Sequence, residues 1–488
     1  MRRIALLLTF AFCLSGIAGC NKDFEEINTN PNNPETVNPE LLMVTVIRSL
    51  VNEMNNNAFS PGNIVAQYSA EIREPATDRY QWTGDFGVWS NGYANLRNVQ
   101  DLYDIATKAK LNNYRGIALV LRALIFSRMT DCYGDLPYSA ALKAKDEDPV
   151  YSPKYDLQKD IYKGLLDELR RADTLLSAQG GYIRNDILFN NDYMKWKRFS
   201  NTLRLRLLLR QSNKVSPAAD MQEILASPAV YPLFQSNDDN AALTYSAAPN
   251  ISPITNQRSG FFMDRRLSRT LADKMNATGD PRLSVFAQPT GKSVTAGSPQ
   301  YVGVRNGETD ANLSSNIDDA VSPLGIIYYN GLQVAVPSQG LVMTFSELQF
   351  ILAEAAQRGW INGDAQAYYE AGIKASIDYY GKIAGKALST PSGFFTQPGI
   401  AYTPANGLEL IGTQKWIALY FNDLQGWHEW KRTGYPALMP SVTNYNDNRI
   451  PVRFLYPTNQ QVTNETNYKA AIAIQGADDI NTKIWWMN

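Results

Sequence analysis

The sequence predicts a mainly α-helical protein in which helices pair into hairpins and long irregular loops separate them. Three segments, residues 157–176, 196–209 and 344–380, repeat apolar residues at helical spacing. Two other segments, 238–260 and 291–322, are rich in Gly, Ser, Asn, Asp and Pro, which favour loops. Apolar residues make up 44% of the 488, which is enough for a sizeable core. We therefore expect a helical scaffold that carries a face built from loops.

The N-terminus predicts export and lipid attachment. Two arginines precede an apolar run at residues 4–14, and Ile-Ala-Gly-Cys at 17–20 has the form of a bacterial lipobox. The apolar run is about half as long as a membrane-spanning helix requires. We expect residues 1–19 to be a cleaved lipoprotein signal peptide and Cys20 to carry the lipid. The alternative is a plain secretory signal in which Cys20 is incidental.

The mature chain divides into a tether and a helical domain. Residues 20–39 are expected to be extended, because turn-forming Asn and Pro residues dominate them. Residues 40–488 are expected to form a single helical domain. Only Cys132 is left for that domain once Cys20 is acylated, so it can hold no internal disulfide. We expect Cys132 to be buried, since it has no histidine partner nearby in sequence.

The helices are assigned from spacing and polarity in chain order. Trp89, Tyr93 and Leu96 recur at helical spacing, which places Trp89 in the core. In residues 157–176 the apolar side chains share one face, and charged side chains can face water. Residues 196–209 form a second helix in which arginines stand between leucines.

The last periodic segment predicts a helical hairpin of tetratricopeptide type. Thr-Phe-Ser-Glu at residues 344–347 is a capping box, which fixes the start of the first helix. Two glycines interrupt the pattern within 358–363, and helical spacing resumes at 365–380. Ala355 and Gly372 would be the small residues that let the two helices approach. The repeat pattern is weak elsewhere, so the sequence does not predict a regular solenoid.

Charge and composition argue against several functions. A formal net charge of −1 does not resemble the basic balance of a nucleic-acid-binding protein. His428 is the only histidine, so a Ser-His-Asp triad or a His-containing zinc site would have to use it. We expect His428 to be packed in the fold instead. No local motif proposes the paired carboxylates of a glycoside hydrolase.

Two weaker motifs do not predict a phosphate-binding loop or a calcium site. Gly-Lys-Ser at residues 291–293 lacks the earlier glycine of a phosphate loop, because Phe286 stands at that position. Asp-Asp-Asn at 238–240 predicts a turn rather than a calcium site, since no spaced ligand loop follows. We therefore expect a protein that is not an enzyme and has no catalytic residue, cofactor or metal.

Ligand-binding chemistry is best represented in residues 73–89. A sugar offers an apolar C–H face, which an aromatic ring can cover, and hydroxyls, which Arg, Asp, Asn and Gln can bond. For Tyr80 and Trp82, ligand binding and packing are both open. One aromatic contact adds only ~0.5–1.5 kcal/mol beyond its buried area, so capture would need several. The candidate ligand-binding residues of this segment are Arg73, Asp78, Arg79, Tyr80, Trp82 and Phe86.

Five segments follow one another in a recognisable order along the chain. They are residues 20–39, 131–138 (Asp-Cys-Tyr-Gly-Asp-Leu-Pro-Tyr), 196–206, 426–436 (Gly-Trp-His-Glu-Trp-Lys-Arg-Thr-Gly-Tyr-Pro) and 450–457, followed by Trp485 and Trp486. Each segment is a weak signal alone, but together they cover nearly the whole chain. In order and spacing they resemble the SusD/RagB family of outer-membrane lipoproteins, in its second SusD-like branch.

The resemblance implies a SusD-like helical domain with four tetratricopeptide-like units, held at the cell surface by its lipid on the outer membrane. It also implies a SusC-like TonB-dependent transporter as partner, and capture of an oligosaccharide or polysaccharide. Family ligand sites draw on the N-terminal aromatic region and on later loops, where Tyr301, Tyr328 and Tyr329 are the candidates. We expect glycan capture; the alternatives are peptide capture on the same fold and a surface glycoside hydrolase.

Overall fold

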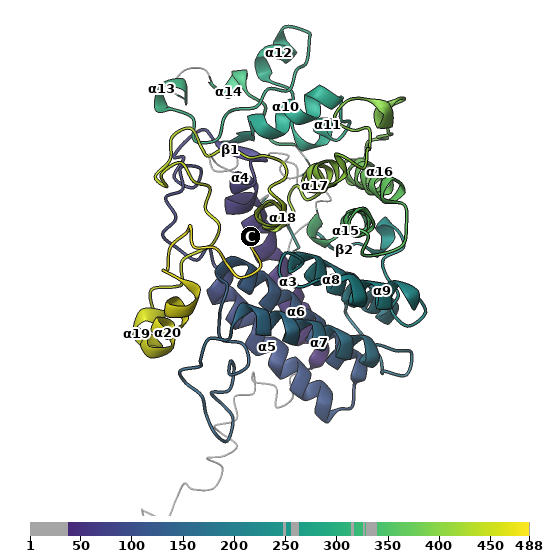
Figure 1. Cartoon of the computed structure of the whole chain (residues 1–488), viewed down its shortest axis with the longest axis vertical. Coiled ribbons are helices and arrows are strands. Elements are labelled where there is room, and N and C mark those ends of the chain that lie inside the picture. The colour runs from purple at the N-terminus through teal and green to yellow at the C-terminus, as the bar shows by residue number, and fades with distance from the viewer. Residues whose placement is uncertain are drawn as a thin grey trace, which may run out of the picture.

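The computed structural model describes residues 38–246, 250–254, 263–313, 317–325, 327 and 339–487. Helices dominate these residues, as the sequence predicts (Figure 1). Cys20 and the rest of the predicted signal peptide and tether, up to residue 37, lie outside the described residues. The helices of the first half are α3 (Pro39–Asn57), α4 (Asn63–Val65), α5 (Val88–Lys108), α6 (Asn112–Tyr133), α7 (Gln158–Leu175), α8 (Tyr193–Arg210) and α9 (Ala218–Ala226).

The second half begins with a group of helices that lie together at the top of Figure 1. They are α10 (Arg269–Thr278), α11 (Leu283–Phe286), α12 (Gly291–Thr295), α13 (Asp310–Leu313) and α14 (Ile317–Ala320). They are followed by α15 (Phe345–Gln357), α16 (Ala365–Ile383), α17 (Gly407–Ala418), α18 (Gln425–Thr433), α19 (Gln460–Thr463) and α20 (Glu465–Gln475).

Two short antiparallel strand pairs join segments that are distant in sequence. Strand β1 (Ser69–Glu71) pairs with β3 (Arg265–Leu267), and β2 (Ala241–Thr244) pairs with β4 (Gln339–Met343). Each pair holds a later segment of the chain against an earlier one, because the two strands of each pair lie far apart in sequence.

The predicted helix pairs are present. Helix α5 packs on α6, α6 on α7, α7 on α8, and α15 on α16. The Thr344 hydroxyl accepts the Glu347 backbone N–H at 3.2 Å, which confirms the cap at the start of α15. Gly372 in α16 faces the ring of Phe350, and a Cβ there would lie 2.9 Å from that ring. The small residue is therefore required for the α15–α16 approach, as predicted.

One hydrophobic cluster contains side chains from Met43 near the start of the described chain to Met487 near its end. Trp89, Cys132 and His428 are all buried in the fold, which confirms the three predictions made for them. Burial lowers the pKa of His428 well below its ordinary value. The imidazole is therefore neutral at physiological pH.

Charged residues of the sequence motifs form a buried ionic network. Glu429 of α18 accepts hydrogen bonds from Lys415 and Arg432, each at 2.8 Å, and Arg432 also pairs with Glu354 at 2.5 Å. On α8, Arg206 pairs with Glu347 at 2.5 Å. All six side chains are almost fully buried. The charges of residues 196–206 and 426–436 therefore serve packing between helices rather than solvation.

The two predicted loops are not wholly irregular, and the expectation is wrong where short elements interrupt them. The first contains a 3₁₀ turn, η2 (Asn237–Asp239), and strand β2, whose partner β4 lies about a hundred residues later. The second contains α12, α13 and α14. The Thr290 hydroxyl accepts the Ser293 N–H at 3.1 Å and caps α12, so Gly-Lys-Ser at 291–293 forms its first turn.

Candidate functional site

Residues 73–86 form the connection between β1 and α5, as predicted, and a buried carboxylate anchors it. Asp78 is fully buried. Its two oxygens accept the Glu71 N–H at 3.1 Å and the Asn306 amide N–H at 2.8 Å. Burial raises the pKa of Asp78 to about 7. Asp78 therefore joins this connection to the segment around Asn306 from inside the protein.

The rings of this connection are packed. Trp82 is only 5% exposed and meets Trp427, Phe454 and Phe86 edge-to-face, with ring centroids 5.4 to 5.7 Å apart. Its indole N–H donates to the Thr77 carbonyl at 3.1 Å. Of the two roles open for Trp82, the structure therefore favours packing.

The Tyr80 ring is also buried, at 3% exposure. Its hydroxyl oxygen accepts the Ser441 backbone N–H at 3.0 Å. Tyr80 thus packs beneath the loop that contains Ser441 and holds that loop in place. Whether Tyr80, Trp82, Phe86 or Asp78 contributes to a ligand stays a prediction. Tyr80, Trp82 and Asp78 are buried, whereas Phe86 is only partly buried.

The two arginines of the connection form ion pairs, Arg73 at the surface and Arg79 with a mostly buried side chain. The Arg73 side chain is half exposed and pairs with Asp264 at 3.0 Å and Asp318 at 2.5 Å. Arg79 donates to the Glu308 carbonyl at 2.9 Å and pairs with Asp310 at 2.5 Å. Both arginines therefore tie the connection to later loops, which the sequence did not predict.

An exposed aromatic residue, Tyr445, lies on a loop whose backbone contacts that of Arg79. Tyr445 is 65% exposed, and its backbone N–H donates to the Arg79 carbonyl at 2.9 Å. The Tyr445 loop also runs against the 306–307 turn, because Thr443 N–H donates to the Gly307 carbonyl at 2.8 Å. Gly307 has φ +61°, and a Cβ there would lie 2.6 Å from the Thr443 carbonyl, so this close approach requires glycine.

These contacts define a surface that we call the Tyr445 platform. Arg305 pairs with Glu308 at 2.8 Å, and their neighbour Asp310 is largely exposed. Burial would raise the pKa of Glu308, but hydrogen bonds from Arg305, Asn312 and the Thr309 N–H, together with the charge of Arg305, outweigh it and lower that pKa to about 2. The platform thus comprises an exposed ring on one loop and, on the segments bonded to that loop, arginine donors and carboxylate acceptors. Its residues are Arg79, Arg305, Glu308, Asp310 and Tyr445.

The later-loop candidates lie elsewhere or cannot be placed. Tyr301 is half-buried against the main core, and Asn276 of α10 donates to its carbonyl at 2.9 Å. Within the described ranges, no hydrogen bond, ion pair or ring contact joins Tyr301 to residues 73–86. Tyr328 and Tyr329 lie outside the described residues.

The two carboxylates of the Asp-Asp-Asn turn at 238–240 form ion pairs within the protein. Asp239 pairs with Arg198 at 2.9 Å, and the Asp238 carboxylate pairs with Lys382 at 3.2 Å. Over the part of the chain that the structure describes, no group of three or more His, Cys, Asp or Glu side chains is placed to hold a metal ion.

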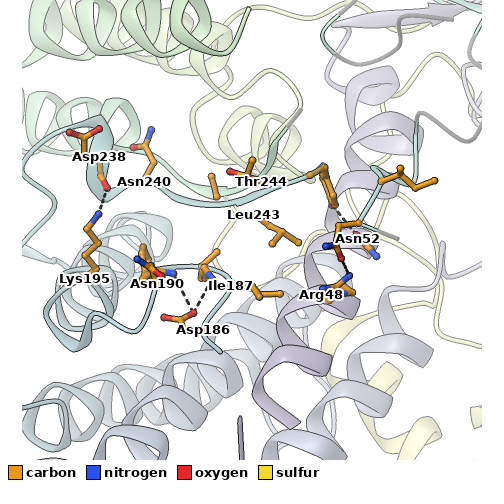
Figure 2. A pocket seen from close by; sticks show the side chains of 16 residues that line it. Arg48, Asn52, Asp186, Ile187, Asn190, Lys195, Asp238, Asn240, Leu243 and Thr244 are labelled. Carbon is orange, nitrogen blue, oxygen red and sulfur yellow. Dashed lines mark hydrogen bonds between the residues drawn. The ribbon is translucent and has the colours of Figure 1, made fainter. Parts of the chain in front are cut away.

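A pocket of about 460 Å³ opens on a different part of the surface, between α3, the loop before α8, and strand β2 (Figure 2). This volume falls in the ~300–1,000 Å³ range of small-molecule sites. Apolar side chains of Ile187 and Leu243 lie toward its middle, and Leu188 also lines it. In Figure 2, Lys195 lies toward one end and Arg48 toward the other.

Tyr445 could have been noticed in the sequence only weakly. It stands in a run of Ser, Thr, Asn and Asp at residues 441–448, which predicts an exposed polar loop. Its neighbour Arg79 is more than three hundred residues earlier, so no local pattern joins them. The pocket is equally hard to notice in the sequence, because three separate segments line it.

A family model described as SusD-like, starch-binding and associating with the outer membrane matches residues 31–457. Solved structures are also similar. A SusD homologue of Bacteroides fragilis is 30% identical with a TM-score of 0.79, and the match covers 92% of this chain and 99% of that one. A chitin-binding protein is 29% identical with a TM-score of 0.78, covering 92% and 100%.

A chitin-binding SusD homologue from Flavobacterium johnsoniae is 26% identical with a TM-score of 0.73, and the match covers 91% of this chain and 98% of that one. A search of curated proteins finds none that matches. Among the helices of the described ranges, none combines the length and apolar character that crossing a membrane requires.

Proposed function

Because the chain belongs to the SusD-like family of starch-binding proteins that associate with the outer membrane, we propose that it captures a glycan at the cell surface. In this proposal the protein is a lipoprotein anchored through Cys20, with residues 40–488 acting as one unit. It delivers the glycan to a SusC-like TonB-dependent transporter in the same membrane. Two similar structures are chitin-binding proteins, which supports a glycan as ligand.

The observation that carries the proposal is the exposed ring of Tyr445 among fixed polar groups. A ring that is 65% exposed can cover the C–H face of a sugar and gain both burial and stacking energy. Arg79 and Arg305 supply donors for hydroxyls, while Asp310 supplies an acceptor. Since Arg79 is held by the Glu308 carbonyl and Asp310, little side-chain freedom is left to lose on binding.

The same platform is poorly suited to hydrolysis. A glycoside hydrolase needs one carboxyl group that stays protonated to donate a proton to the leaving oxygen. The pKa of Glu308, at about 2, keeps this carboxyl ionised at every physiological pH. We therefore propose binding without catalysis.

The experiment is affinity electrophoresis of the protein through gels that contain soluble polysaccharides, including starch and glycol chitin, with reducing-sugar release measured in parallel. We expect retardation by at least one polysaccharide and no release of reducing ends. Release of reducing ends by the purified protein would overturn the non-catalytic assignment. Retardation by none of the polysaccharides, together with binding of oligopeptides, would replace glycan capture with peptide capture.

A further inference from the structure

The pocket of Figure 2 has a wall that is fixed before any ligand binds. The Asp186 carboxylate accepts the Leu188 N–H at 2.9 Å and the Trp196 indole N–H at 2.8 Å. It also accepts the Asn191 N–H, at 3.3 Å. One buried carboxylate thus fixes the loop that forms the lower side of the pocket. Strand β2, paired with β4, forms the other side.

Among the residues that the structure describes, the two cations of the pocket have no acidic partner. Arg48 donates to the side-chain oxygen of Asn250, and Lys195 donates to the backbone carbonyl of Asp238 at 2.6 Å. In the described ranges, neither Arg48 nor Lys195 lies within ion-pair distance of a carboxylate. Because partial charges on amides neutralise a cation less well than a carboxylate does, both can still gain by meeting an anion.

The two acidic residues of the lining do not cancel these cations. The Asp186 oxygens are directed into their own loop and are occupied by N–H groups, as described above. The Asp238 carboxylate is exposed and pairs with Lys382, which does not line the pocket. The charge offered to a ligand in the pocket is therefore positive.

The remaining polar groups of the pocket suit hydroxyls. Each amide side chain presents both a donor and an acceptor, as a hydroxyl does. The Tyr245 hydroxyl donates to the Asn52 side-chain oxygen at 2.9 Å, which leaves the Asn52 amide nitrogen to donate elsewhere. The amide and hydroxyl residues of the lining are Asn52, Asn190, Asn240, Asn250, Thr244 and Tyr245.

A peptide bound along β2 is the less favoured occupant. Strand β2 has only four residues, and its pairing with β4 shifts between Ala241 and Ala242. Such a bulge bends the strand and disrupts the regular backbone hydrogen bonding that an added peptide strand needs. The apolar middle of the pocket, its amide side chains and its two cations instead match a ligand with ring C–H faces, hydroxyls and carboxylates.

We propose that this pocket is a second binding site, for a sugar unit that carries a carboxylate, such as a uronic acid. It deepens the proposed function by naming an acidic class of glycan, and it rests on that function only in taking a saccharide as ligand. Arg48 and Lys195 each bind a carboxylate of the saccharide, the amide side chains bind its hydroxyls, and Ile187 and Leu243 contact its ring carbons.

The test is calorimetric titration of the full-length lipoprotein in detergent with digalacturonate, its dimethyl ester and glutarate. The ester keeps the rings and hydroxyls without the charge, and glutarate keeps two carboxylates without the rings. We expect digalacturonate to bind more tightly than either, by ~10-fold or more, since a hydrogen bond to a charged group is worth about 1.5–3 kcal/mol. Equal binding of the ester or of glutarate would overturn the proposal.

Single substitutions test whether digalacturonate binds in this pocket. Arg48→Gln and Lys195→Gln should each weaken digalacturonate binding by ~10-fold or more, for the same reason. Lys382→Gln removes a neighbouring cation outside the lining and should leave it unchanged. Equal losses in all three would show general attraction to positive charge, and tighter binding of an acidic tetrapeptide than of digalacturonate would identify a peptide site. Either result would refute the saccharide pocket.

The two proposals can fail separately. If polysaccharide capture persists and depends on Tyr445 while digalacturonate does not bind, the pocket proposal fails and the proposed function stands. If digalacturonate binds through Arg48 and Lys195 while polysaccharide capture is indifferent to Tyr445, the pocket stands and the platform fails.

Discussion

Replacing Trp82 by alanine should destabilise the fold without removing an exposed binding surface. The ring is 5% exposed and lies within 6 Å, centroid to centroid, of the rings of Phe86, Trp427 and Phe454. Truncating a large buried aromatic side chain typically costs ~3–5 kcal/mol, since it removes burial and leaves a cavity. Loss of the hydrogen bond to Thr77 leaves that carbonyl without its partner and adds to the cost.

Because the protein is large, this cost corresponds to only a small shift in Tm. Unfolding entropy near 60 °C is about 2.1 cal/mol/K per residue, or roughly 0.9 kcal/mol/K for a cooperative unit of about 450 residues. Trp82→Ala should therefore lower Tm by about 3–5 °C. Circular dichroism at 222 nm follows the loss of helix, and urea titration gives the free energy of unfolding directly.

Tyr445→Ala is the matched control, because it removes an aromatic ring that is mostly exposed. Its free energy of unfolding should stay within about 0.5 kcal/mol of the wild type. If Trp82→Ala melts like the wild type and loses glycan affinity, the packing role of Trp82 is refuted and this ring belongs to the binding surface.

Three further predictions follow from burial, charge and the N-terminus. Glu429→Gln should lower the free energy of unfolding in urea titration by about 3–5 kcal/mol, because it leaves buried cations without full charge compensation. Glu465→Gln, in an exposed ion pair, should leave it nearly unchanged, and equal costs would contradict the buried network. Cys20→Ala should move the protein from the membrane to the soluble fraction or block its processing, and full retention of a correctly exported variant would refute the lipid anchor. The pKa of Asp78 is raised to about 7 in the fold, so this group binds a proton more readily folded than unfolded, and its stabilising effect is lost as pH rises from about 4 to about 7. The stability of the wild type relative to Asp78→Asn should fall over that pH range, and a flat or rising difference would contradict the burial argument.

Helix positions could be predicted from the sequence because they depend on local spacing. Helices α7, α8, α15 and α16 lie close to the segments predicted for them, and the cap at Thr344 is present. The burial of α8 could not be predicted in the same way. Its arginines suggest a face open to water. However, Arg206 forms an ion pair with Glu347, about 140 residues later in the chain, and both side chains are buried.

The sequence shows which charged and aromatic residues the connection at 73–86 contains, but not how they pack. The surroundings of Trp82 could not be foreseen, since Trp427 and Phe454 come from more than three hundred residues later. Tyr445 was missed for the same reason, because among the described residues it is joined to this segment by a backbone hydrogen bond to Arg79, which no local pattern indicates.

The most direct test of glycan capture at the Tyr445 platform is the dissociation constant of Tyr445→Ala for a polysaccharide that retards the wild type. Losing the ring should cost about 1–3 kcal/mol of burial and stacking, which is a ~5- to ~150-fold weaker affinity. Tyr151→Ala serves as control, since Tyr151 is also exposed but lies on the loop beside α19, and its affinity should equal that of the wild type. Unchanged affinity in Tyr445→Ala, with the wild type binding the same polysaccharide, would contradict the account.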